Sequence, residues 1–80
     1  MTEIPREPGY YYPSDHAVIR KRDRGIQWGW VAHTIENGRA HPSVQDDCRV
    51  IMERIDQADE LLQVVANVES GEIVTVAWYE

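Results

Sequence analysis

The chain has 80 residues, 42% of them hydrophobic, and a net charge of −6 at neutral pH. This length fits one domain, and the acidic balance argues against generic coating of DNA or RNA because like charges slow association with phosphate backbones. The single cysteine, Cys48, excludes an internal disulfide and has no companion ligands at a zinc-site spacing, so no metal or cofactor is expected.

Residues 1–13 are predicted to form an extended N-terminal arm. Prolines surround a run of three tyrosines at 10–12, a composition that disfavours a helix. The arm precedes a single α+β domain predicted over 14–80. Because no apolar run reaches signal-peptide or membrane-spanning length, we expect a cytoplasmic protein without membrane contact.

A first helix is predicted to begin at Ser14 or Asp15, both good N-caps, and to end at Gly25, which suits the left-handed position after a helix. Within it, His16, Arg20 and Arg24 would lie along one edge, because residues four apart share a helix face. This edge is the one place where the sequence predicts that an anion could be held.

The charge is predicted to be two-sided. Residues 14–25 carry four basic and two acidic side chains, a sum of +2, whereas residues 40–80 carry two basic and nine acidic side chains, a sum of −7. Salt bridges from the first helix to acidic strand residues would be the ordinary structural role of its arginines. The acidic candidates are Asp46, Asp47 and Glu53.

A second helix is predicted from about Trp28 to Asn37, ending at Gly38. Its apolar stripe consists of Trp28, Val31, Ala32 and Ile35. Trp30 falls opposite this stripe and is therefore expected to be exposed. The very short link between the two helices predicts a hairpin or an angled pair.

Three antiparallel strands are predicted at 48–55, 61–68 and 72–79, where strand-forming residues gather. A loop at 56–60 joins the first two, and a tight turn ending at Gly71 joins the last two, with that glycine free to take a positive φ. A short extra strand near 39–44 would be confined to an edge by Pro42. The expected architecture is two N-terminal helices packed on a three- to four-stranded antiparallel sheet, an α+β fold.

Apolar residues occupy both alternation sets of these strands. One set is Val50, Met52, Leu62, Val64, Ala66, Val68, Val74, Val76 and Trp78, and the other is Ile51, Ile55, Leu61, Val65, Ile73, Ala77 and Tyr79. Two helices can cover only one face of a sheet. The second face would be covered by the tyrosine arm, by a second copy in a homodimer or by a binding partner, and the pattern leaves these alternatives open.

Several short motifs occur in order along 15–79. They are His16-Ala17, Arg20, Arg24-Gly25-Ile26, Val31, Ile35, Asn37-Gly38 and Ile73-Val74-Thr75-Val76. In these the chain resembles the family called domain of unknown function 4258. The family looks like a relative of the compact helix-then-sheet toxins of the RelE and BrnT kind, which implies ribonuclease activity in some relatives. The chain departs from the pattern at Lys21, at Gln27, which is a poor N-cap, and at Trp30.

The leading hypothesis is a small interaction effector that binds and modulates or inhibits a partner protein, such as a host factor or a cognate partner. Its size suits an effector encoded by a phage or mobile element. An exposed tryptophan commonly anchors an interface. The candidate partner-binding residues are Trp30, His33, Tyr10, Tyr11 and Tyr12. Burial of Trp30 within the molecule is the competing interpretation.

The alternative is a metal-independent, toxin-like ribonuclease with local RNA contact. Its candidate catalytic residues are His16, Arg20, Arg24 and Tyr79. Arginine forks bind phosphate, and histidine can act as a general acid or base near neutral pH. A further alternative is an acidic mimic of nucleic acid. His33 and His41 have no recognised ligand spacing with Cys48, which again predicts no metal.

Overall fold

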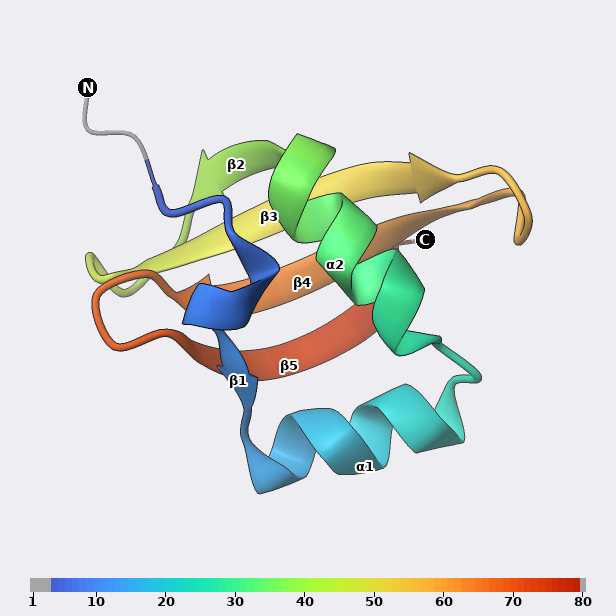
Figure 1. Ribbon diagram of the computed structural model, residues 1–80, viewed down its shortest axis with the longest axis horizontal. Helices are drawn as coiled ribbons and strands as arrows, with labels where there is room; N and C mark the ends of the chain where they lie inside the picture. Colours follow the sequence, from blue (N-terminus) through green and yellow to red (C-terminus); the bar gives the residue numbers. More distant parts are fainter. Residues whose placement is uncertain (1–3, 80) are drawn as a thin grey trace.

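The computed structural model, which describes residues 4–79, has one sheet with one helix packed across a face and the other along the sheet edge (Figure 1). After a short 3-10 turn at Pro8–Tyr10, the elements are β1 (Tyr12–Pro13), α1 (Asp15–Asp23), α2 (Trp28–Asn37), β2 (Arg39–Pro42), β3 (Cys48–Ile55), β4 (Glu60–Asn67) and β5 (Glu72–Tyr79). The predicted α+β class and both predicted helices are confirmed.

Local capping chemistry sets the bounds of α1. The Ser14 hydroxyl accepts a hydrogen bond from the Ala17 backbone N–H at 3.1 Å, which satisfies one of the free donors of the first turn. At the other end, Gly25 adopts a φ of 65°, as predicted. By contrast, Gln27 gives α2 no side-chain cap.

The sheet differs from the prediction. It has five strands in the order β1-β5-β4-β3-β2, and β1 runs parallel to β5 while the other pairs are antiparallel. The predicted architecture, two N-terminal helices on a three- to four-stranded antiparallel sheet, is therefore wrong. Strand β1 precedes both helices and makes the sheet mixed. The physical reason is that the extended arm hydrogen-bonds to the edge of β5, through Tyr12 N–H to the Gly71 carbonyl at 2.8 Å.

Beyond its short pairing with β1, the edge of β5 is covered by α1 and its flanking residues. The Ser14 hydroxyl donates to the Val74 carbonyl at 3.0 Å, and an Arg24 guanidinium N–H donates to the Val76 carbonyl at 2.8 Å. In return, the Trp78 indole N–H donates to the Arg24 carbonyl at 2.9 Å. These contacts fix α1 along the sheet edge, which would otherwise be open to further strands.

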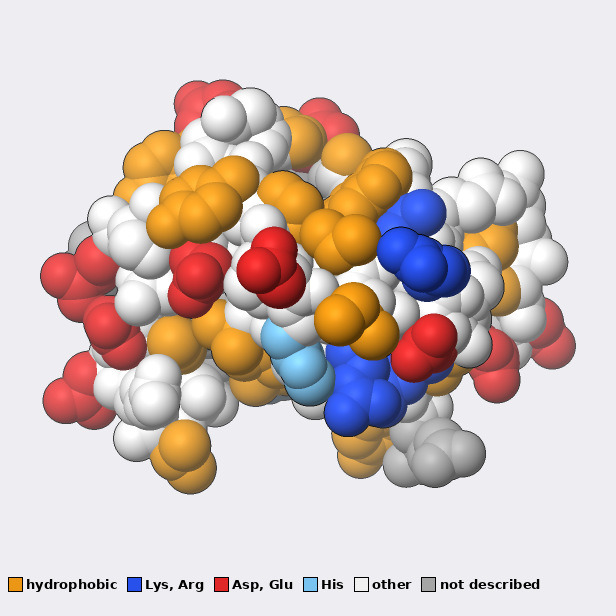
Figure 2. Space-filling view, turned by 90° about the horizontal axis from the view of Figure 1, so that it is seen from below, with side chains coloured by type: hydrophobic (Ala, Val, Ile, Leu, Met, Phe, Trp, Pro, Cys, Tyr) orange, Lys and Arg blue, Asp and Glu red, His pale blue; other side chains and the backbone are white. Residues whose placement is uncertain are grey.

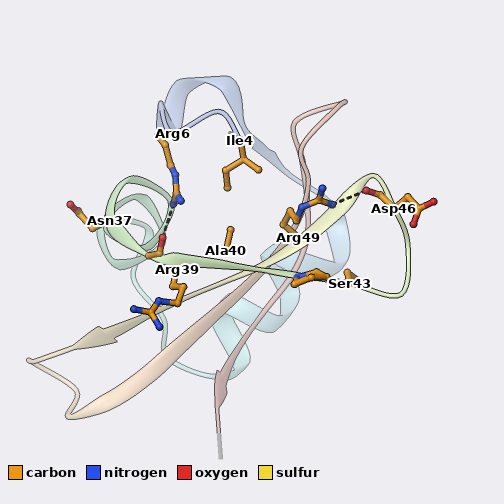
Figure 3. Close-up of a pocket in the computed structure, with 10 residues that line it drawn as sticks. Ile4, Arg6, Asn37, Arg39, Ala40, Ser43, Asp46 and Arg49 are labelled. Atoms are coloured by element: carbon orange, nitrogen blue, oxygen red, sulfur yellow. Dashed lines mark hydrogen bonds between the residues drawn. The ribbon is translucent and has the colours of Figure 1, made fainter. Parts of the chain in front are cut away.

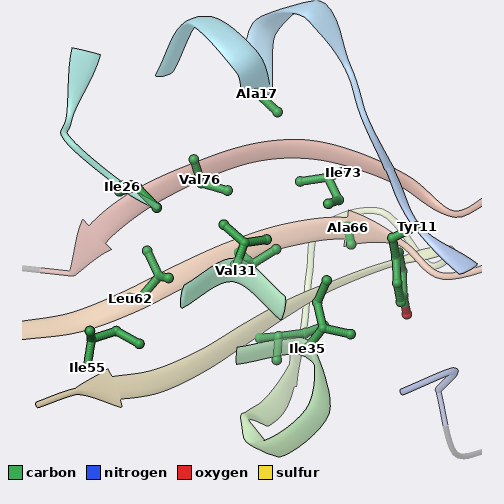
Figure 4. Close-up of a cluster of buried hydrophobic side chains, with 12 residues drawn as sticks. Tyr11, Ala17, Ile26, Val31, Ile35, Ile55, Leu62, Ala66, Ile73 and Val76 are labelled. Atoms are coloured by element: carbon green, nitrogen blue, oxygen red, sulfur yellow. The ribbon is translucent and has the colours of Figure 1, made fainter. Parts of the chain in front are cut away.

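The core lies between the sheet and α2, with contributions from α1, the helix link and the arm (Figure 4). Ile51, Leu62, Val64 and Val76 of the sheet are 0% exposed. The cluster also includes Ile55, Ala66 and Ile73 of the sheet, Val31 and Ile35 of α2, Ala17 of α1, Ile26 of the link and Tyr11 of the arm. Because β3, β4 and β5 each alternate, one face of the sheet is buried here and the next residues along each strand point to the other face.

Cys48 is buried at the start of β3, and its thiol lies 3.4 Å from the Gln45 side-chain oxygen. Burial, and next the Asp47 carboxylate, raise the pKa of the thiol above its ordinary value. Because the thiolate is the reactive form, we expect a thiol reagent to modify the folded protein at least about tenfold more slowly than the urea-unfolded chain at neutral pH. Equal rates in the two states would contradict this burial.

Candidate functional site

The face of the sheet opposite the helices carries a band of apolar side chains. Cross-strand pairing places Val50 beside Val65, Leu61 beside Tyr79 and Gln63 beside Ala77. Each is next to a residue that is buried in the core or packed against it, so its side chain points away from the helices. We call Val50, Met52, Leu61, Val65, Ala77 and Tyr79 the outer band. All six are partly or well exposed, and Tyr79 is 57% exposed.

Basic groups accompany the outer band. Arg39 and His41 of the edge strand β2 lie opposite Met52 and Val50, and Arg54 follows on β3. Arg54 forms ion pairs with Asp56 and Asp59 at the hairpin end. Arg39 is exposed and has no ion pair within residues 4–79. On this face, no outward position of β2, β3, β4 or residues 75–79 carries a carboxylate.

The candidate catalytic residues do not converge on one site. Arg20 donates a long hydrogen bond of 3.4 Å to the His16 ring, whereas the Arg24 guanidinium binds the Val76 carbonyl at the edge of β5. Tyr79 belongs to the outer band, on the opposite side of the sheet from the core. None of the four lines the hollow beside the arm and β2 or the one beside Tyr11 and Trp28.

The basic residues of α1 also lack the acidic partners that the sequence suggested. No ion pair within residues 4–79 joins α1 to Asp46, Asp47 or Glu53. Figure 2, which views the molecule from below Figure 1, shows Lys and Arg side chains in two groups with hydrophobic and acidic side chains between them. The helix therefore presents separate cations and not one continuous basic surface.

Trp30 is not the exposed residue that the sequence predicts. It is partly buried, its ring lies 5.7 Å from that of Trp78, and its indole N–H donates to the Gln57 side chain at 2.9 Å. Trp28, predicted to be in the apolar stripe, is instead 41% exposed. The reason is a rotation of α2 that buries Thr34 beside Val31 and Ile35, which the Thr34 hydroxyl permits by bonding the Trp30 carbonyl at 2.9 Å.

The remaining candidates for partner binding are dispersed. His33 is an exposed residue of α2, with its ring nitrogen 3.8 Å from a Glu53 carboxylate oxygen. The Tyr10 hydroxyl donates to the Val68 and Glu69 carbonyls at 2.8 Å. Tyr12 is 51% exposed, whereas Tyr11 lies in the core, where burial raises the pKa of its hydroxyl. The described arm thus packs on the helix side and leaves the outer band uncovered.

Within residues 4–79, no cluster of His, Cys, Asp or Glu is large enough to be a candidate metal site, and neither helix has the length and apolar character needed to cross a membrane. Comparisons with protein-family models, curated proteins and solved structures found no match for this chain. The resemblance to the domain of unknown function 4258 family stays a prediction.

Proposed function

We propose that this protein is a small interaction module that binds a partner protein through the outer band of its sheet. The observation that carries the proposal is that this apolar band is covered neither by the helices nor by the described part of the arm. Contiguous exposed apolar surface on a small protein is typical of interaction sites. By covering a surface of the partner, the protein would modulate or inhibit that partner.

The dimensions of this face suit a specific complex. Strands β2 to β5 are neighbours in the sheet, and β3, β4 and β5 each have eight residues. With strands about 4.8 Å apart and about 3.4 Å per residue, the face measures roughly 19 by 27 Å. This is of the same order as the surface of about 800 Å² that each partner contributes to a standard interface.

Charge indicates the chemistry of the partner. Arg39 and His41 flank the apolar band at the β2 edge, where the outward positions of β2 and β3 carry no carboxylate. A second copy packed face to face would add two more cations and no carboxylate from the outward positions of β2 or β3. A partner with an apolar centre and carboxylates at its rim is complementary to this arrangement.

Capture of the partner by three bait proteins would test the proposal: the wild type, a variant changed on this face and a control variant changed elsewhere. Val65→Arg places a charge in the middle of the outer band, and Ile19→Arg is a matched control at a 52% exposed residue of α1. In a lysate of the source organism, wild type and Ile19→Arg are expected to retain a protein that Val65→Arg loses. The same protein, once purified, is expected to bind wild type at least about tenfold more tightly than it binds Val65→Arg.

Two further measurements test whether charged contacts at the rim contribute to binding. Arg39→Glu is expected to weaken the purified complex, and added salt is expected to weaken wild-type binding, because the rim contacts are charged. Retention of the same proteins by wild type and Val65→Arg would contradict the proposal. A homodimer seen by light scattering, and dissociated by Val65→Arg, would assign the face to a second copy instead.

A further inference from the structure

A hollow of about 850 Å³ lies between the N-terminal arm, the end of α2 and strand β2 (Figure 3). The arm contributes Ile4 and Arg6 to its lining, and the segment from the end of α2 to the start of β3 contributes Ala40 and Arg49 among others. The volume falls within the range of about 300–1,000 Å³ found for small-molecule sites. None of the six outer-band residues lines this hollow, although Arg39 lies at the border of both surfaces.

Arg6 is held at one wall of the hollow by main-chain carbonyls. One of its terminal nitrogens, Nη1, donates to the Ile35 carbonyl at 3.1 Å and to the Gly38 carbonyl at 2.7 Å. These carbonyls belong to the end of α2, where a cation is favoured by the helix dipole. The guanidinium is thereby positioned without a carboxylate partner among the described residues.

Arg49 is held in the same way at the other wall. Its Nη1 donates to the Asp46 and Cys48 carbonyls, both at 2.7 Å. It too forms no ion pair within residues 4–79. In both arginines the carbonyls occupy Nη1, which leaves the edge formed by Nε and Nη2 available. That edge has two parallel N–H donors and fits the two oxygens of one carboxylate.

The space between the two arginines is apolar. Figure 3 shows Arg6 and Arg49 at opposite sides of the hollow, with Ile4 and Ala40 between them, while the Asp46 carboxylate points away. A single small anion would leave the apolar side chains between the two cations without a partner (Figure 3). A chain with an anionic group at each end would contact both, and its middle would lie against the apolar side chains.

We propose that this hollow binds a linear organic dianion, namely a dicarboxylate with a carboxylate at each end of an aliphatic chain. One carboxylate pairs with the Nε and Nη2 edge of Arg6 and the other with that of Arg49, while the methylene groups pack against Ile4 and Ala40. Because carbonyls already hold both guanidinium groups in place, little side-chain entropy is lost when the ligand binds.

Calorimetric titration of the whole protein with succinate, adipate and suberate tests the proposal. The matched controls are butyrate, hexanoate and octanoate, which keep the chain and remove one carboxylate, and inorganic phosphate. One dicarboxylate is expected to bind at least about tenfold more tightly than its monocarboxylate and than phosphate. Arg49→Gln is expected to lose this preference, and Arg49→Lys to lose most of it because lysine lacks the fork. Arg54→Gln, at the distant β3–β4 hairpin, is expected to bind as wild type does.

Amide chemical shifts of the wild-type protein locate the ligand without any substitution. The preferred dicarboxylate is expected to shift the amides of Ala40 and Ser43, which line the hollow, and to leave those of Leu61 and Ala77 in place. Absence of binding at millimolar concentration would overturn the proposal. Equal affinity for mono- and dicarboxylates, or shifts confined to other surfaces, would overturn it as well.

Discussion

Replacement of Tyr11 with alanine is expected to lower the free energy of unfolding by about 3–5 kcal/mol, as for other large aromatic truncations in cores. Tyr11 is 8% exposed, packs in the main core cluster and donates its hydroxyl to the Pro5 carbonyl at 2.8 Å. A domain of this size has a total stability of only about 4–12 kcal/mol, so the loss is a large fraction of it. Urea unfolding followed by circular dichroism measures the change.

The neighbouring tyrosines and a conservative variant serve as controls. Tyr12→Ala, at a residue that is 51% exposed, is expected to cost less than about 1 kcal/mol. Tyr11→Phe keeps the ring, removes only the hydroxyl bond and is expected to cost about 0.5–1.5 kcal/mol. Similar losses for Tyr11→Ala and Tyr12→Ala would mean that the arm does not contribute to the core.

The elements predicted best are those whose limits depend on nearby residues. Helix α1 occupies the predicted segment because Ser14 and Gly25 act on the turns beside it, and α2 ends before Gly38 as predicted. The edge position of the strand containing Pro42 also follows from one residue, because proline lacks the N–H that a central strand would need. Such local chemistry is visible in a single sequence.

The faces of the strands depend instead on pairing between distant residues. The alternation sets group Val50 with Val64, yet the structure pairs Ile51 with Val64 and buries both. A displacement of one residue between strands moves a whole set to the other face. A further irregularity between Val65 and Ala66 changes the alternation again on β5. Neither register nor bulge has a reliable local pattern.

Long-range contacts also explain why the sequence did not predict strand β1 or the hollow beside the arm and β2. Gly71 has a φ of 86°, and a Cβ there would come within 2.5 Å of the Tyr10 carbonyl oxygen, so the turn glycine also makes room for the arm. A two-residue strand has no periodicity from which to predict it. Arg6 and Arg49 likewise share no motif, and only folding brings them to the same hollow.

Leu61 and Leu62 provide the sharpest test of which face of the sheet is buried. Leu62 is 0% exposed, so Leu62→Ala is expected to destabilise the fold by about 2–5 kcal/mol. Leu61 belongs to the outer band, so Leu61→Ala is expected to cost less than about 1 kcal/mol but to weaken binding of the partner. Urea unfolding gives the first quantity, and titration with the purified partner gives the second. The opposite order of stabilities would require a register shifted by one residue, which would place the helices on the apolar band now proposed to bind the partner.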